Sequence, residues 1–248
     1  MMNLFITTLS IVATSFSFAG CEDITISNND NQAKVNGNGN VQTQERPIST
    51  FDKIEINGVF NVFLSQGDKE QVKVETDENL QSLIVSSVTN NVLSVTMRDS
   101  ASIGKMKKIN IYISVVHLSS ITTNGVGKLK CTSPIKVSAL SLDCKGVGLT
   151  ELNVEGDKLS VNSETVGELK LSGTMKETSI KHSGLGLINA FGLLNEKLNL
   201  DVDGIGAAEV YASKDLTITS NGVGGVRYKG HPAVKRIKNE GIGKVVED

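Results

Sequence analysis

One short phrase recurs seven times in the C-terminal half of this chain: a polar residue, a glycine, an aliphatic residue and a second glycine. The copies begin at Asn124, Lys145, Glu164, Ser183, Asp203, Asn221 and Glu240. In one copy Thr165 takes the place of the first glycine. Because a repeat period near twenty residues is typical of coils stacked on one another, we predict an all-β, right-handed parallel β-solenoid (a β-helix) with rungs of about 19–20 residues.

Apolar residues recur at fixed distances from the first glycine position of each phrase. They stand four residues before it and one, four and six residues after it; in the third copy these are Val161, Val166, Leu169 and Leu171. We predict that all four columns point into the coil and that the glycines form its corners, since glycine reaches backbone angles closed to other residues. The column five residues after the glycine alternates in charge and is predicted to face solvent.

The N-terminal half is less regular. Residues 35–120 show short runs with a period of two, such as Ile54 and Ile56, which predict strands. Leu80, Leu83 and Ile84 have helical spacing and predict one short helix. We expect this β part to lead into regular rungs over residues 121–248.

The first twenty residues have the pattern of a signal peptide. Residues 4–18 are apolar or small and uncharged, a stretch too short to span a bilayer. Small residues then precede Cys21, as at the sites where bacterial lipoproteins are acylated, so we predict a signal peptide over 1–20, lipid attachment at Cys21 and a flexible polar tether over 21–34. The alternative is ordinary cleavage after Ala19. In both cases the protein is exported, as an outer-membrane lipoprotein or a periplasmic or cell-surface protein.

Charge and cysteine content limit the classes of partner. The formal net charge is −2, whereas a nucleic-acid-binding protein needs a basic surplus, so no nucleic acid is expected. If Cys21 carries lipid, Cys131 and Cys144 remain as an even pair in an oxidising compartment. They form either a disulfide or two buried thiols.

Few residues are candidates for chemistry. His182 falls in an inward column with Ser163 and Ser220, which favours a hydrogen-bond ladder over catalysis. No Cys/His cluster has metal-ligand spacing, so we expect no metal, cofactor or catalytic residue. Phe191 and Tyr211 fall in one outward column on successive rungs, where the rings would be in stacking range, and form the candidate binding surface.

The stretch Phe51 to Asp68 (FDKIEINGVFNVFLSQGD) resembles the opening of the head GIN domain family of auto-transporter adhesins, also called DUF2807. The repeated glycine phrases continue the resemblance, which covers roughly residues 35–248. Val116 departs from the family pattern, since similar proteins often carry proline there. The resemblance implies a β-solenoid on exported, often lipid-anchored proteins of Gram-negative bacteria, with no established catalytic residues.

The sequence therefore predicts a non-enzymatic envelope protein that presents a binding or adhesion surface to an unidentified ligand or protein, glycans among the candidates. One alternative is a structural envelope protein without a specific ligand. Another is a polysaccharide-active β-helix enzyme, for which Asp143, Lys181 and Asp201 share one outward column. The membrane would be contacted through the N-terminal lipid. The open edge formed by Lys244 to Asp248 also allows an end-to-end homo-oligomer.

Overall fold

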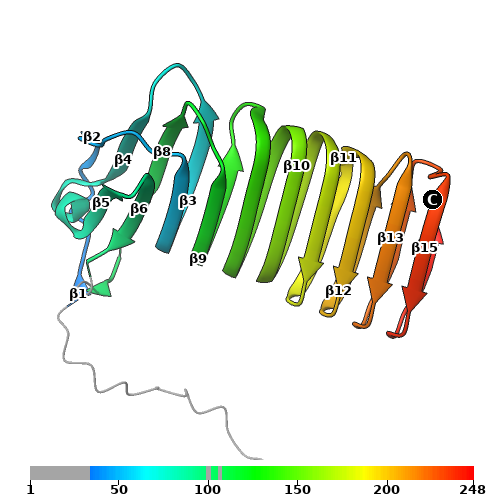
Figure 1. Ribbon diagram of the computed structural model, residues 1–248. Helices are drawn as coiled ribbons and strands as arrows, with labels where there is room; N and C mark the ends of the chain where they lie inside the picture. The colour runs from blue at the N-terminus through cyan, green and yellow to red at the C-terminus, as the bar shows by residue number, and fades with distance from the viewer. Residues whose placement is uncertain (1–33, 99–101, 106–107) are drawn as a thin grey trace, which may run out of the picture. The chain divides into compact units, whose positions relative to one another are not determined.

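The computed structural model describes residues 34–98, 102–105 and 108–248. The chain divides into a first unit, Met1–Asn31, and a second, Gln32–Asp248. Cys21 and the predicted signal peptide lie outside the described residues. The second unit is all-β, as predicted, and its described residues contain one helix, the short 3₁₀ helix η1 (Glu78–Leu83) (Figure 1).

Strands make up most of the described residues. They are β1 (Lys34–Val35), β2 (Val41–Arg46), β3 (Lys53–Gln66), β4 (Gln71–Asp77), β5 (Ile84–Thr89), β6 (Val92–Met97), β7 (Ser102–Ile103), β8 (Asn110–Val115), β9 (Ser120–Cys131), β10 (Ile135–His182), β11 (Leu185–Val202), β12 (Ile205–Tyr211), β13 (Asp215–Ser220), β14 (Val226–Lys229), β15 (Val234–Asn239) and β16 (Val245–Glu247).

The N-terminal part is arranged around β3. This strand pairs in parallel with β9 along most of its length, and with β6 and β8 at its two ends. Beyond β8 the sheet continues through the antiparallel strands β4 and β2. The helix η1 follows β4 directly and buries Leu80 completely, so the predicted helix is confirmed.

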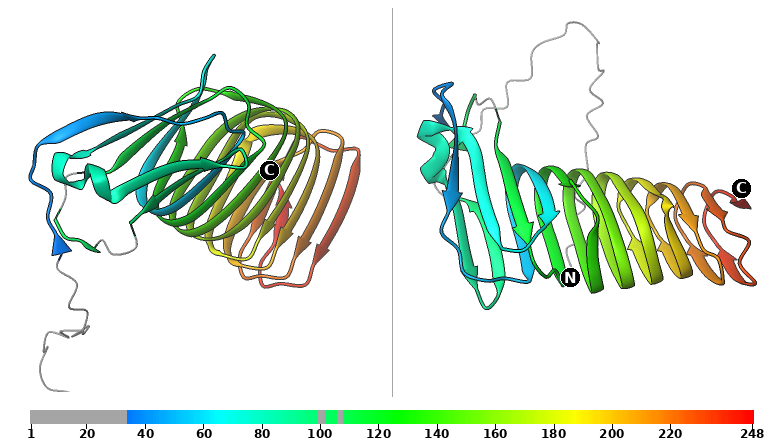
Figure 2. Two further views of the ribbon diagram at one scale, coloured as in Figure 1. Left: turned by 60° about the vertical axis from the view of Figure 1, so that its left-hand side comes forward. Right: turned by 90° about the horizontal axis from the view of Figure 1, so that it is seen from above.

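The repeated phrases lie side by side. Gly125 is paired with Gly146, and Gly186 with both Gly167 and Gly206, always between parallel strands. We call the chain from one phrase to the next a pass. From β12 onward each pass is split into two strands, with β12, β14 and β16 on one side and β13 and β15 on the other. Figure 2 shows the passes following one another along the sheet.

Three of the four predicted inward columns form the core. The members four residues before the glycine are Ile121, Leu142, Val161, Ile180, Leu200 and Ile218, all 3% exposed or less. The columns four and six residues after it are buried in the same passes, and include Leu169, Leu171, Ile188 and Val210. In the last pass that the structure describes, Ile237 is 42% exposed, because β15 is paired on one side only, with β13.

The fourth column faces solvent, and the prediction that it points inward is wrong. Its members are 45% to 74% exposed: Val126, Val147, Val166, Leu185, Ile205, Val223 and Ile242. Side chains alternate between the two faces of a strand, and the three buried columns all lie an even number of residues from the first glycine. The two glycines therefore take the inward positions, and the residue between them points outward.

The exposed column extends into the N-terminal part, where Val59 is paired with Val126 and is 45% exposed. We call the eight exposed residues of this column the aliphatic ridge: Val59, Val126, Val147, Val166, Leu185, Ile205, Val223 and Ile242. Its members contact solvent and add little to the core. The ridge is therefore a feature of the surface.

Close approach of successive passes explains the glycines on either side of the ridge. The second glycine of each phrase has a φ angle between 141° and 152°, which side chains rarely adopt. A Cβ atom at Gly206 would lie 1.7 Å from the carbonyl oxygen of Gly186, and one at Gly184 would lie 2.0 Å from that of Thr165. Thus six of the seven copies have glycine at the first position, and all seven at the second, where the backbone of one pass lies against the backbone of the next.

Candidate binding surfaces

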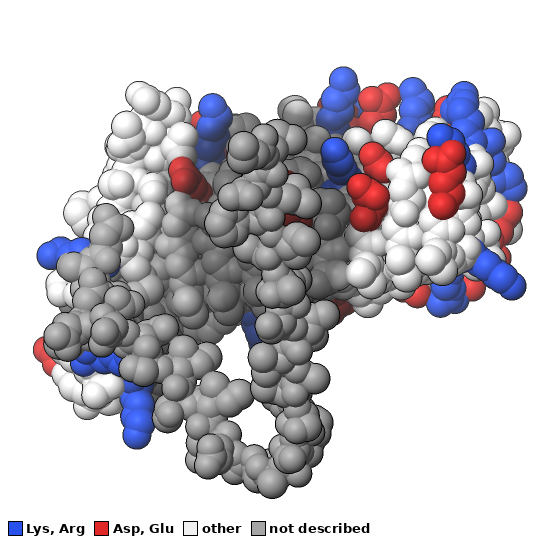
Figure 3. Space-filling model, turned by 90° about the horizontal axis from the view of Figure 1, so that it is seen from below, with Lys and Arg blue, Asp and Glu red and all other residues white. Residues whose placement is uncertain are grey.

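The outward column of alternating charge is neutralised by its own ion pairs, as predicted. Glu151 lies 3.1 Å from both Lys130 and Lys170, and Arg227 lies 3.0 Å from Glu209. Hydrogen bonds from Lys170 and Lys130 hold the pKa of Glu151 below its usual value. Figure 3 shows basic and acidic side chains interspersed on the C-terminal side of one face. The charges of this column are therefore paired with one another.

The inward polar column is a hydrogen-bond ladder at its centre. His182 Nδ1 lies 3.2 Å from Ser163 Oγ, which in turn lies 3.1 Å from Thr165 Oγ1. His182 is only 4% exposed, and burial lowers its pKa. Among the described residues Nε2 of this ring has no hydrogen-bond partner. Both side chains of the Ser–His pair are buried in the core.

The two cysteines of the described unit are free, buried thiols. Burial raises the pKa of Cys131 to about 11 and also raises that of Cys144. Cys144 Sγ lies 3.7 Å from Thr150 Oγ1. In the described part of the chain, no group of three or more His, Cys, Asp or Glu side chains could hold a metal ion.

Phe191 lies at a β-bulge. The register between β10 and β11 shifts from Lys170 opposite Asn189 to Ser172 opposite Gly192, so that two residues of β11 oppose one of β10. Bulges re-aim side chains and are common near functional sites. Here Lys229 Nζ lies 4.2 Å from the centre of the Phe191 ring, within the range of a cation–π contact.

Tyr211 ends β12 and lines a groove. The groove has a volume of about 660 Å³, and its lining includes Glu155, Asp157, Lys176, Glu196 and Tyr211. Asn195 is 2% exposed and donates from Nδ2 to the Tyr211 carbonyl at 3.1 Å. A buried amide therefore fixes the backbone that carries the Tyr211 ring.

The predicted stacking of Phe191 on Tyr211 does not occur. Within the described residues, the stacked rings are Phe63 and Tyr112, whose centres lie 5.1 Å apart with planes inclined by 17°. The cationic side chain of Lys229 lies over the Phe191 ring instead. Phe191 and Tyr211 fall in the same outward column, but this does not bring their rings together. The bulge at Phe191 changes the local direction of its side chain.

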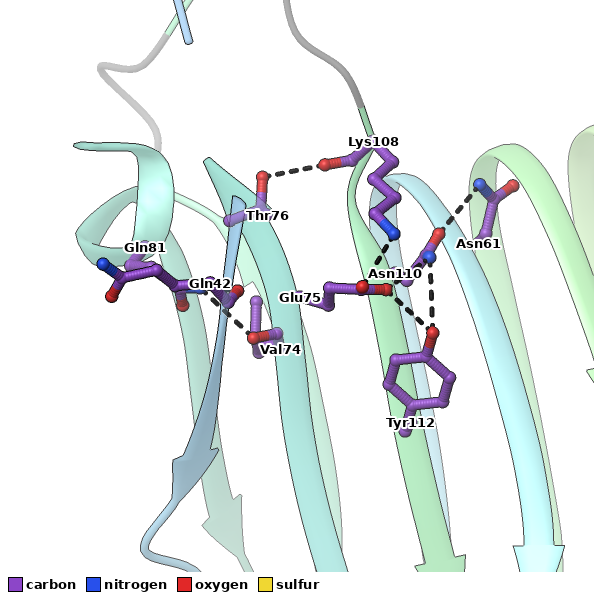
Figure 4. A network of polar contacts seen from close by, with 9 residues as sticks. All are labelled: Gln42, Asn61, Val74, Glu75, Thr76, Gln81, Lys108, Asn110 and Tyr112. Atoms are coloured by element: carbon purple, nitrogen blue, oxygen red, sulfur yellow. Dashed lines mark hydrogen bonds and ion pairs between the residues drawn. The ribbon is translucent and has the colours of Figure 1, made fainter. Parts of the chain in front are cut away.

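Phe63 and Tyr112 form a second aromatic group, which the sequence pattern does not predict. Glu75 accepts hydrogen bonds from Lys108 at 2.7 Å and from Asn110 and the Tyr112 hydroxyl at 2.8 Å each (Figure 4). The bond from Lys108 is the main cause of the lowered pKa of Glu75. The sequence indicates the alternation of apolar and polar residues within each strand. It does not indicate the pairing of β3 with β8, which brings together residues 49 positions apart.

These features define an all-β repeat protein in which the column of alternating charge faces outward and Phe191 and Tyr211 are half-buried. The family model described as putative auto-transporter adhesin, head GIN domain, matches residues 50–232, and the chain belongs to this family. Membership agrees with an exported or surface protein. No described helix is long and apolar enough to cross a membrane.

Solved structures support the same fold. A crystal structure of a putative adhesin from Bacteroides fragilis is 26% identical, with a TM-score of 0.84, and the match covers 86% of this chain and 100% of that chain. A putative lipid binding protein from Parabacteroides distasonis is 25% identical over the same shares of the two chains, with a TM-score of 0.68. The comparison with curated proteins finds no match.

Proposed function

We propose that the chain is an exported, non-catalytic protein of the bacterial envelope that presents a binding or adhesion surface on a right-handed β-solenoid. The solenoid is supported by the parallel register that places each phrase beside the next. The binding role is supported by family membership and by the similarity to a chain described as a putative adhesin.

The N-terminal residues would provide the anchor. In this proposal a signal peptide over 1–20 is removed, Cys21 carries lipid and residues 21–34 separate the β unit from the outer membrane. The support is the apolar run followed by small residues before Cys21. Incorporation of labelled palmitate that is lost in a Cys21→Ser variant is the corresponding biochemical test.

The region of Phe191 and Tyr211 is the proposed binding surface, and the groove that Tyr211 lines is the observation that carries this assignment. An aromatic ring that lines a groove can stack on a sugar ring or a partner's side chain. The carboxylates of Glu155, Asp157 and Glu196 can accept hydrogen bonds from ligand hydroxyl groups. A glycan or a glycosylated protein fits this chemistry.

We expect a Phe191→Ser/Tyr211→Ser variant to lose most of its binding to glycan arrays and host surfaces, because both apolar contact surfaces are removed. Far-ultraviolet circular dichroism should be unchanged, since both side chains are only half-buried. The matched control is Phe63→Ser/Tyr112→Ser, which removes the other aromatic pair. Binding equal to that of the unaltered chain would exclude the Phe191 surface.

Two other results would point to the alternative functions. Absence of binding to every glycan and surface tested would favour a structural envelope protein without a specific ligand. Cleavage of an acidic polysaccharide would favour an enzyme, and would direct attention to the column of Asp143, Lys181 and Asp201. In the structure Lys181 and Asp201 are paired across neighbouring strands, as a charge ladder requires.

A further inference from the structure

The aliphatic ridge is a continuous apolar strip on the surface. Val126 is paired with Val59 and Val147, and Ile205 with Leu185 and Val223. Val166 is paired with Leu185. The step from Val147 to Val166 is also contiguous, because the backbone of Gly167 lies against that of Gly148. A row of exposed branched side chains without a functional role is unusual, since contiguous apolar surface of this kind marks interaction sites.

The dimensions of the ridge fit a weak protein interface. Along the ridge, eight residues on strands about 4.8 Å apart span about 34 Å. Across the ridge, each phrase contributes five residues, from its polar residue to the residue after its second glycine, and these span about 13 Å. Two such strips would bury about 900 Å² in total, less than the roughly 1,200 Å² at which stable specific interfaces begin and within the range of weak, transient ones. An interface of this size gives reversible association.

We propose that the ridge is the contact face of a homodimer in which two copies of the chain lie face to face and antiparallel. The two-fold axis would pass between Val166 and Leu185, at the middle of the ridge. This arrangement pairs the first member of the ridge on one copy with the last member on the other. Every ridge residue then contacts an aliphatic residue of the second copy.

The charges beside the ridge select this arrangement. Lys145 stands two residues before the ridge residue Val147, and Asp203 two residues before the ridge residue Ile205. Both lie at the same distance from the proposed axis. Lys145 of each copy would therefore face Asp203 of the other, which gives two such pairs in the dimer. Both residues are exposed. Opposite charges at an interface set register and orientation.

Other arrangements of two copies place like charges together. In a parallel dimer the two-fold axis would run along the ridge. The residue two positions before a ridge residue on one copy would then face the residue two positions after it on the other, so Glu164 would face Glu168. If the antiparallel copies were displaced by one pass in either direction, Glu164 would face either its own counterpart or Asp203. A membrane surface fits poorly, since Glu164, Asp203 and Glu240 would have to approach the apolar phase.

Analytical ultracentrifugation tests the dimer with the chain from Glu22 onward, which lacks the proposed lipid anchor. We expect reversible dimers that form between micromolar and submillimolar concentration. A Val166→Thr/Leu185→Thr variant keeps residues that favour strands and should raise the dimer Kd by roughly tenfold or more, because four side chains lose apolar contact in each dimer. Val85→Thr, at an exposed valine of β5, is the matched control and should leave Kd unchanged.

A charge exchange tests the register. Lys145→Asp places carboxylates opposite each other and should weaken the dimer, while the double variant Lys145→Asp/Asp203→Lys should restore it. A chain that stays monomeric at submillimolar concentration would overturn the proposal. So would a dimer that Ile237→Ser disrupts and the ridge variant leaves intact, because the contact would then be end to end, through the exposed last pass.

Discussion

Replacing Gly206 by alanine should lower the free energy of unfolding by about 2–6 kcal/mol, from about 1–3 for a strained backbone and about 1–3 for overpacking. The φ angle of Gly206 is 147°, and the added Cβ would lie 1.7 Å from the carbonyl oxygen of Gly186. That oxygen belongs to the backbone of the neighbouring pass, so it cannot rotate away. Urea denaturation followed by circular dichroism measures the loss.

Gly192 provides the matched control on β11. A Cβ at this position would meet its nearest neighbour, the Cβ of Ser172, at 3.4 Å, which is close to ordinary contact. Alanine at Gly192 should therefore change the free energy of unfolding by less than about 1 kcal/mol. Equal losses for the two alanine variants would show that close approach of the passes does not explain the glycine phrase.

Replacing Leu200 by alanine should cost about 2–5 kcal/mol of folding stability, because its side chain is fully buried and a cavity would remain. Leu200 is paired with Ile180 on one side and Ile218 on the other, so neighbouring passes cannot easily close the gap. The same urea titration measures this loss.

Leu185→Ala is the control for Leu200, since it makes the same chemical change on the same strand. Leu185 is 47% exposed and lies on the aliphatic ridge, so its loss should cost less than about 1 kcal/mol in the monomer. If both variants lost the same stability, the distinction between core columns and the ridge would be wrong.

The period of the glycine phrase was sufficient to predict which residues lie side by side. Gly125 lies beside Gly146 because each pass repeats the same backbone bend, and residues such as Leu142 and Ile121 are then stacked. The aliphatic character of the ridge residues predicts the wrong face, whereas their position in the strand predicts the right one. Val126 lies an odd number of residues from Ile121 and Leu129, so alternation alone places it on the opposite face.

The aromatic groups were harder to predict for two physical reasons. Phe191 lies at a bulge, and one extra residue in a strand changes the direction of a side chain without a distinct sequence signal. Phe63 and Tyr112 are brought together by β3 and β8, outside the repeated passes, where no period relates one strand to the other. Long-range pairing of this kind depends on the packed fold.

Thiol labelling tests most directly which aliphatic columns face solvent. Val166→Cys and Leu169→Cys are compared in the chain from Glu22, at low micromolar concentration where the proposed dimer is dissociated, and Cys131 and Cys144 supply a buried background. We predict that a maleimide reacts with the native Val166→Cys variant as fast as with the unfolded chain, and with the Leu169→Cys variant only after unfolding. Protection at position 166 together with rapid reaction at position 169 would contradict the account.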